Sequence, residues 1–380
     1  MNSNNNSSRI AALDLARIIG MLMMIQGHVI DSLAPVSIAN VNDFPWNIWH
    51  FFRGVTAPIF LIVSGAVQVF ANNRDQSGLL NRLTINKRVF TVFKLLFIGY
   101  FLNLPVRKIY DLIYIDSSLW QSFYQVNILQ LLAMTLVIVL LIYFFTRTDS
   151  QLGVISLVLG IIFCFATPLV QSQPWFVNYP DFIGEYFSLE HGSHFAIFPF
   201  SGYMLFGIYL GTTIKSVSKE NRLIYLKTKL PVYGLLIGLL GIPLYYIFLK
   251  YPYNFPNVNN ANPGMVLIRT GIVLEIIGAV TFLYSKFEKY SEIFSFFGQR
   301  ALFVYIAHII ILYGLLDMPS IGRVFNKNLE MIWVYISVAA VLSLSLLFVL
   351  FIGKTSQKYS FLKPVYRSII VFYILYILFY

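Results

Sequence analysis

The chain has 380 residues, of which 58% are hydrophobic, 17% are aromatic and only 11% are charged. A soluble domain carries about a quarter charged residues, so this composition excludes an ordinary soluble protein and indicates a polytopic membrane protein. The net charge of +11 does not indicate nucleic-acid binding, because the basic residues lie in short loops between apolar runs. The single cysteine, Cys164, excludes a disulfide within the chain and a cysteine metal cluster.

Continuous apolar runs predict an all-α fold with about eleven transmembrane helices, each near the ~20 residues that a bilayer requires. A transmembrane barrel would instead show short alternating segments. We expect one transmembrane domain over residues 1–380, with a disordered polar tail at 1–8. The predicted spans are 12–34, 47–71, 88–106, 122–146, 151–171, 196–214, 231–249, 264–285, 297–317, 330–353 and 365–380.

The first predicted span carries four ionisable side chains, Asp14, Arg17, His28 and Asp31. A charged group at mid-helix costs roughly 2.5 to 3.5 kcal/mol, so such groups usually face a protein interior or a wet cavity. Asp14 and Arg17 share one helix face, and His28 lies about 16 Å farther along the helix. A cleaved signal peptide is the alternative, but Asp14 would be out of place in one, so an uncleaved helix is favoured.

Lysine and arginine residues indicate how the chain is oriented in the membrane. If the N-terminus is cytoplasmic, most of these residues fall in inner loops, and few fall in outer loops. The outer ones are Arg107, Lys108, Lys250, Arg323 and Lys327. The positive-inside rule therefore predicts a cytoplasmic N-terminus and places His28 towards the outer face.

Two neighbouring segments suggest acid–base chemistry near this outer face. The imidazole of His28 suits proton transfer near neutral pH, and Asp31 could orient the ring or stabilise its cation. The alternative is a helix-end histidine that is hydrogen-bonded to a neighbour and has no further role. In the second span, His50 and Arg53 share a face. Arg53 could hold a carbonyl oxygen or an anionic acceptor, or could only reach the lipid headgroups.

A basic cluster in the segment NRLTINKRVF contains Arg82, Lys87 and Arg88, and Lys94 follows it. These cations suit the phosphates of a nucleotide-like cofactor or of lipid headgroups. Ordinary anchoring by the positive-inside rule is the alternative explanation. The segment therefore predicts a phosphate-compatible cytoplasmic side without identifying the phosphate.

Later segments supply further histidines. His191 and His194 open the sixth span; they are thin evidence for a metal and fit an aromatic, protonatable lip for a sugar acceptor. Gly207 and Gly211 form a small-xxx-small pair that predicts close helix packing. His308 lies near mid-bilayer in the ninth span, where a buried histidine with satisfied hydrogen bonds is the competing interpretation.

Four motifs together resemble a known family. They are Asp14-Leu-Ala-Arg17 with Gly27-His28, FRGVTAPIFLIVSG, HGSHFAIFPFSGYMLFG and FFGQRALFVYIAH. Their order resembles the bacterial relatives of the heparan-α-glucosaminide N-acetyltransferase catalytic-domain family, itself related to membrane acyltransferase family 3. The resemblance extends from Arg9 to about Tyr313. One departure is Arg17-Ile18, where related sequences usually have Arg-Gly.

The resemblance implies a transferase that moves an acetyl group from cytoplasmic acetyl-CoA to an amine or hydroxyl of an extracytoplasmic sugar or glycan. It implies a catalytic role for His28, as general base or as carrier of an acetyl intermediate, to which we add Asp31 and Arg53. The residues expected to bind the donor are Asp14, Arg17, Arg82, Lys87, Arg88 and Lys94. The residues expected to bind the acceptor are His50, His191, His194 and His308.

We expect an integral protein of a bacterial inner membrane, with a cell-envelope sugar as acceptor. Acetyl-CoA is the expected co-substrate, membrane lipids are expected partners, no metal is expected, and a homodimer is left open. The rival class is a proton-coupled or lipid-linked-glycan transporter, since intramembrane ionisable residues such as Glu275 could form a relay. The chain lacks the internal repeats that are common in secondary transporters. A scaffold protein would leave the buried charges unexplained.

Overall fold

The computed structural model describes residues 10–106, 108–172, 179–190, 192–250, 258–315 and 319–358, with isolated positions beyond 367. In this part of the chain the regular elements are helices, and one isolated antiparallel bridge joins Arg74 to Leu80. The predicted all-α class is therefore confirmed. The predicted tail at 1–8 and most of the predicted span 365–380 lie outside the described residues.

Eight helices in the described ranges are long and apolar enough to cross a membrane, or up to nine if one bent pair counts as a span. They are α1 (Ala11–Leu33), the consecutive helices α2 (Trp46–Arg53) and α3 (Thr56–Ala71), α6 (Ile128–Phe145), α7 (Asp149–Gln171), α9 (Ile197–Ser216), α10 (Arg222–Leu249), α12 (Pro263–Lys286) and α16 (Met331–Lys358). The bent pair, α13 (Ser291–Gln299) and α14 (Ala301–Tyr313), turns by 60°. The predicted number of spans, eleven, is not confirmed, and the cytoplasmic N-terminus stays a prediction.

One predicted span, 88–106, coincides with a helix that carries several cations. This helix, α4, covers Arg82–Leu102 and is not among the candidate spans. The remaining helices are short: α5 (Ser117–Tyr124), α8 (Asp181–Gly184), α11 (Val258–Ala261), α15 (Ile321–Phe325) and the 3-10 helices Ile109–Ile113, Lys219–Asn221 and Glu288–Tyr290.

The chain divides into two compact units, each built from segments that are far apart in sequence. The first unit contains Met1–Arg17, Gly54–Asn103 and Tyr124–Ser295. The second contains Ile18–Arg53, Leu104–Phe123 and Phe296–Tyr380. Helix α1 therefore contributes its first turns to one unit and its remaining turns to the other. The assignment of 1–380 as one domain stays a prediction.

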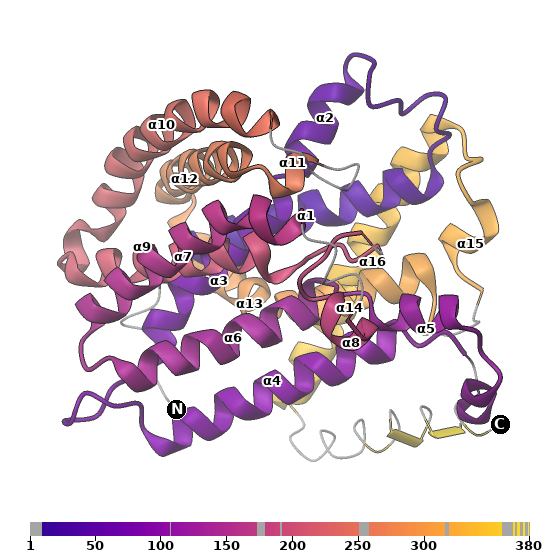
Figure 1. Ribbon diagram of the computed structural model, residues 1–380, viewed down its shortest axis with the longest axis horizontal. Helices are drawn as coiled ribbons and strands as arrows, with labels where there is room; N and C mark the ends of the chain where they lie inside the picture. Colours follow the sequence, from indigo (N-terminus) through magenta and orange to yellow (C-terminus); the bar gives the residue numbers. More distant parts are fainter. Residues whose placement is uncertain are drawn as a thin grey trace. The chain divides into compact units, whose positions relative to one another are not determined.

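Glycines bring helix backbones into direct contact in the first unit. A Cβ atom on Gly207 would overlap the carbonyl oxygen of Ile62, and one on Gly211 would lie 2.5 Å from the carbonyl oxygen of Ala66. Helices α3 and α9 therefore touch along a strip of small residues, as membrane helices commonly do. The packing role predicted for Gly207 and Gly211 is confirmed. Helices α10 and α12 of the same unit also lie side by side (Figure 1).

We expect Gly207→Ala to lower the free energy of unfolding of the detergent-solubilised protein by about 1–3 kcal/mol, and with it the melting temperature. The reason is that the added methyl group would overlap backbone atoms. Gly238→Ala is the matched control, since nothing lies within 4 Å of a Cβ atom there and alanine favours a helix. The measurement is the melting temperature, obtained from the amount of monodisperse protein that size-exclusion chromatography detects after heating. Equal melting temperatures for the two variants would contradict the close contact.

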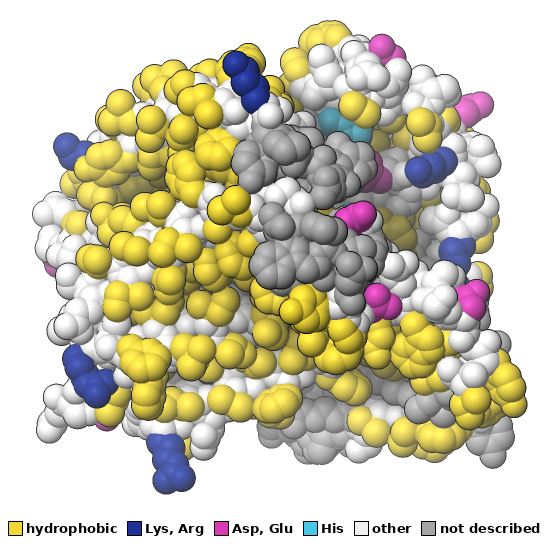
Figure 2. Space-filling view, viewed as in Figure 1, with side chains coloured by type: hydrophobic (Ala, Val, Ile, Leu, Met, Phe, Trp, Pro, Cys, Tyr) yellow, Lys and Arg dark blue, Asp and Glu magenta, His cyan; other side chains and the backbone are white. Residues whose placement is uncertain are grey.

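The surface of the first unit is apolar where its helices lack a protein neighbour. Figure 2 shows broad hydrophobic areas, including one over α10. The side chains of Val232, Leu235, Leu236, Leu239 and Leu240 on α10 are each more than half exposed. A soluble protein rarely exposes so large an apolar patch, whereas lipid tails contact it without cost. The protein is therefore an integral membrane protein.

In the second unit, the C-terminal end of α1 is held by backbone hydrogen bonds. The amides of Lys327 and Leu329 donate to the carbonyls of Ser32 and Leu33 at 3.0 and 3.1 Å. The last carbonyls of a helix have no partner within the helix, so these bonds satisfy groups that would otherwise be unpaired. They fix the end of α1 that carries His28.

Candidate functional site

His28 lies in the second unit, where two side chains of α14 contact its partly exposed ring. The hydroxyl of Tyr313 is 3.2 Å from the Nδ1 atom of His28. The ring of His308 lies 5.6 Å from the ring of His28, centroid to centroid, with the planes tilted by 31°. The structure thus places His28 beside His308, which the sequence analysis treated separately. It also places the hydroxyl of Tyr313 beside His28.

Asp31 and Arg53 form a two-pronged ion pair on the same unit. The Nη1 atom of Arg53 donates to Oδ1 of Asp31 at 2.8 Å, and Nη2 pairs with Oδ2. Such bidentate pairs fix the plane of the guanidinium group. The guanidinium also lies over the ring of Trp49, 5.6 Å from its centroid, and the ring of His50 packs edge-on against the same indole at 4.8 Å. Asp31, Arg53 and His50 therefore form one cluster.

His308 is fully buried, and one of its two ring nitrogens forms a hydrogen bond within its own helix. Its Nδ1 atom lies 3.2 Å from the carbonyl oxygen of Val304, one turn earlier in α14. A carbonyl can only accept, so Nδ1 carries the hydrogen and Nε2 keeps a lone pair. Among the described residues, this Nε2 atom has no hydrogen-bond partner. The histidine is thus only half satisfied by its own helix, and its substrate-binding role stays a prediction.

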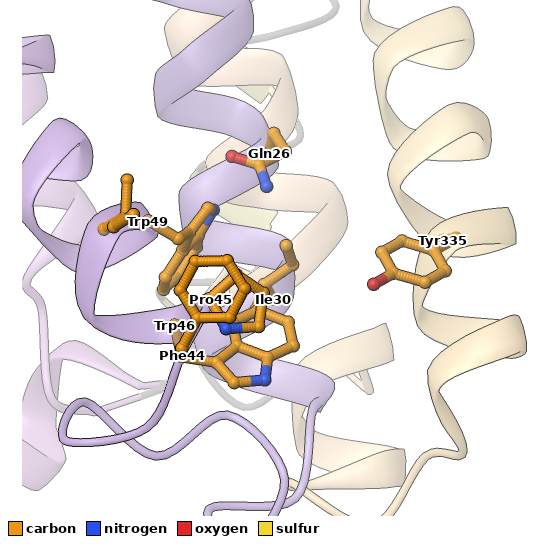
Figure 3. A pocket seen from close by; sticks show the side chains of 8 residues that line it. Gln26, Ile30, Phe44, Pro45, Trp46, Trp49 and Tyr335 are labelled. Carbon is orange, nitrogen blue, oxygen red and sulfur yellow. The ribbon is translucent and has the colours of Figure 1, made fainter.

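A groove of ≈ 410 Å³ opens beside α1 in the same unit (Figure 3). It is lined by Gln26, Ile30, Phe44, Pro45, Trp46, Ile48, Trp49 and Tyr335. Figure 3 shows the indoles of Trp46 and Trp49 near Gln26, with Tyr335 on the facing helix. Gln26 and His28 are two residues apart, which is about 200° around a helix, so the groove and His28 lie on opposite sides of α1. The groove lining contains neither a carboxylate nor an imidazole, so we place the chemistry on the His28 side.

The predicted donor-binding residues belong to the first unit. Asp14 is fully buried and Arg17 is partly buried in the first turns of α1. On α4, the side chains of Arg82, Lys87 and Lys94 are exposed.

Arg88 is the partly buried member of the predicted basic cluster. Its Nε atom donates to Oδ1 of Asn72 at 2.7 Å, which ties α4 to the end of α3. The exposed cations of α4 are compatible with an anionic ligand, whereas Arg88 has a structural partner. Donor binding by this set of residues stays a prediction.

Of the two histidines in the loop before α9, the structure describes His194. His191 lies outside the described residues. His194, in the first unit, is exposed, and its backbone amide donates to the carbonyl of Val126 at 3.2 Å. Within the described ranges, no group of three or more His, Cys, Asp or Glu side chains is arranged to hold a metal. The predicted sugar-binding lip stays a prediction.

Sequence reasoning missed Tyr313. It lies in the last turn of the same predicted span as His308, directly before Gly314, which ends α14 with a φ of +79°. The available signal was a hydroxyl group at the end of an otherwise apolar run, in the span of a histidine already singled out. That signal is weak, because tyrosine is common at the ends of membrane helices.

The helical fold and the partly exposed polar cluster around His28 define an integral membrane protein with a histidine-containing site. The model of the family described as Heparan-alpha-glucosaminide N-acetyltransferase, catalytic, matches residues 9–250, and the chain belongs to this family. The protein is therefore a transmembrane acetyltransferase, of a family that uses acetyl-CoA as acetyl donor. The matched range includes His28 and Arg53 and ends before His308 and Tyr313. The chain has no significant match among curated proteins or among solved structures.

Proposed function

We propose that the protein transfers an acetyl group from cytoplasmic acetyl-CoA to an amine or hydroxyl of an extracytoplasmic sugar, in a bacterial inner membrane. The observation that carries this proposal is the imidazole of His28, held by Tyr313 within a membrane-spanning helix of an acetyltransferase family. An intramembrane ionisable residue is a functional candidate by default, because it costs free energy to insert. A scaffold protein would not require an ionisable side chain such as that of His28 at this position.

The reaction proposed for His28 is general base catalysis. The acceptor gives its proton to Nε2 of His28 while its nitrogen or oxygen attacks the thioester carbonyl carbon. The carbon–sulfur bond then breaks, and the coenzyme A thiolate leaves and takes the proton from the imidazolium of His28, which regenerates the base. For Nε2 to accept a proton, Nδ1 must carry the ring hydrogen, and the hydroxyl oxygen of Tyr313 can accept that hydrogen. A hydroxyl group can also donate, so the proposed role of Tyr313 is to stabilise the tautomer with the hydrogen on Nδ1.

Arg53 is proposed to stabilise the negative charge that develops on the thioester oxygen. A preorganised cationic donor lowers the energy of such an oxyanion without reorganisation during the reaction. The bidentate contact with Asp31 and the indole of Trp49 hold the guanidinium in place. The contact that supports a role for Asp31 is thus with Arg53, and orientation of His28 by Asp31 stays a prediction.

The decisive experiment supplies radiolabelled acetyl-CoA to inside-out vesicles that contain the protein and identifies what becomes labelled. We expect label on a sugar-containing acceptor. Label on His28 without an acceptor would indicate an acetyl-histidine intermediate, and its absence would indicate direct transfer. Solute counterflow in proteoliposomes without acetyl-CoA, together with no acetylated product, would favour the transporter instead.

We expect Tyr313→Phe to lower kcat by about two- to tenfold with little change in KM. The physical reason is the loss of one hydrogen bond to Nδ1, which contributes about 0.5–1.5 kcal/mol. Tyr335→Phe, in the same unit but in the groove, is the matched control and should keep wild-type kinetics. A Tyr313→Phe enzyme with unchanged kcat would show that tautomer selection does not limit the reaction.

A further inference from the structure

Arg269 is a buried cation of the first unit that the proposed reaction does not use. It lies in the membrane-spanning helix α12, and only 7% of its surface is exposed. A charge inside a membrane protein is normally paired with another group, because burial removes its hydration. The partners of this guanidinium therefore indicate whether its role is structural or is to bind a ligand.

The partners of Arg269 among the described residues do not carry a compensating negative charge. Its Nη1 atom donates to the side-chain oxygen of Asn260 at 3.0 Å, a neutral partner. Among the described residues, no carboxylate forms an ion pair with it, and its buried Nε atom has no hydrogen-bond partner. The buried hydroxyl of Tyr203 lies within hydrogen-bond reach of this guanidinium and can accept from it, which leaves the hydrogen of the hydroxyl group to donate. Both partners of the cation are therefore neutral.

Other arginines of the same unit show what a structural arginine looks like here. Arg74 pairs with Asp149 and donates to the carbonyl oxygens of Gly78 and Thr146, each at 2.7 Å. Arg222 donates to three carbonyl oxygens at 3.2 Å around the end of α9. Each of these guanidinium groups meets several anionic or carbonyl oxygens. Arg269 meets only the neutral side chains of Asn260 and Tyr203 among the described residues, so its charge is not offset as theirs is.

The guanidinium of Arg269 lies against Gly54, two residues before α3 begins. A Cβ atom on Gly54 would lie 2.6 Å from its Nη2 atom, so this approach requires a residue without a side chain. Gly54 itself is partly exposed. A buried cationic side chain therefore reaches a partly exposed stretch of backbone, where an anion can approach it.

We propose that Arg269, where it lies against Gly54, binds an oxyanionic group, a carboxylate or a phosphate, of a substrate. An oxyanion would neutralise the buried charge and accept hydrogen bonds from Nε of Arg269 and from the hydroxyl of Tyr203. The group belongs either to the acceptor sugar or to the donor. Only this identification of the ligand as a substrate rests on the proposed function.

The test is thermal unfolding of the purified full chain in detergent, with inorganic phosphate titrated against chloride at constant ionic strength. We expect phosphate to raise the Tm in a saturable way. Arg269→Gln should weaken the apparent affinity by at least about tenfold, because charge-assisted hydrogen bonds are lost. Lys250→Gln removes an equal charge from an exposed site of the same unit and should keep the wild-type response.

Gly54→Ala keeps the arginine and places a methyl group against its guanidinium, so it tests the site if Arg269→Gln does not fold. Glucuronate, glucosamine and coenzyme A then separate the sources. A shift with glucuronate alone assigns the anion to the acceptor, and a shift with coenzyme A alone assigns it to the donor. Glucosamine, which carries no oxyanion, should have no effect.

The proposal is overturned if none of the anions shifts the Tm of the wild-type protein, or if Arg269→Gln and Gly54→Ala both respond as the wild type does. The assay needs no turnover, so it can be repeated in the His28→Ala background. If the wild-type protein binds anions but transfers no acetyl group, the proposed function is refuted and the anion site is supported.

Discussion

Replacement of His28 by alanine is expected to abolish acetyl transfer, with a loss of about 10²–10⁴-fold in kcat/KM. The imidazole is the proposed base, and its neighbours cannot replace it. His308 is fully buried and keeps its Nδ1 hydrogen on a helix carbonyl, while Tyr313 is a poor base near neutral pH. The measurement is the initial rate of label incorporation from acetyl-CoA in inside-out vesicles, at matched protein content.

The control for His28→Ala is its insertion and folding. His28 is partly exposed, so its truncation should leave the melting temperature of the solubilised protein close to that of the wild type. His308→Ala is a useful comparison, because removal of a buried ring should lower stability as well as rate. Retained turnover in well-folded His28→Ala protein would falsify the catalytic assignment.

Replacement of Arg53 by glutamine is expected to lower kcat by about 10²–10³-fold, the usual effect of removing one oxyanion donor. Arg53→Lys keeps the charge but not the two-pronged contact with Asp31, so it should recover only part of the rate. The measurement is the separate determination of kcat and KM for acetyl-CoA. A rise in KM alone would place Arg53 in substrate binding.

Asp31→Asn provides the matched test of how Arg53 is held. If Asp31 acts only by positioning the guanidinium, the variant with both substitutions, Asp31→Asn and Arg53→Gln, should be no slower than Arg53→Gln alone. Independent effects would instead multiply. Wild-type kinetics in Arg53→Gln would mean that this side chain only reaches towards lipid headgroups, as the sequence also allowed.

The membrane-spanning elements could be predicted from local sequence because a bilayer imposes a simple requirement on each segment. Continuous apolar runs located α7, α9 and α12 to within two residues at each end, and located the end but not the start of α6. The close packing at Gly207 was also local, since small residues spaced four apart mark one helix face. Segments with cations, such as α4, were harder, because hydropathy and charge oppose each other there.

The sequence by itself determined which side chains are costly to place in a membrane: Asp14, Arg17, His28 and His308 all stand out against apolar neighbours. It could not determine their partners. Only the tertiary structure brought Tyr313 to His28, turned Asp31 towards Arg53 and, within the described ranges, left Arg269 without a carboxylate partner.

The physical reason is the range of the forces involved. Insertion into a bilayer depends on the composition of about twenty consecutive residues, which can be read from the chain. A hydrogen bond requires two atoms within about 3 Å, and those atoms come from helices whose packing depends on the whole fold. Residues distant in sequence, such as His28 and His308, therefore meet only in three dimensions.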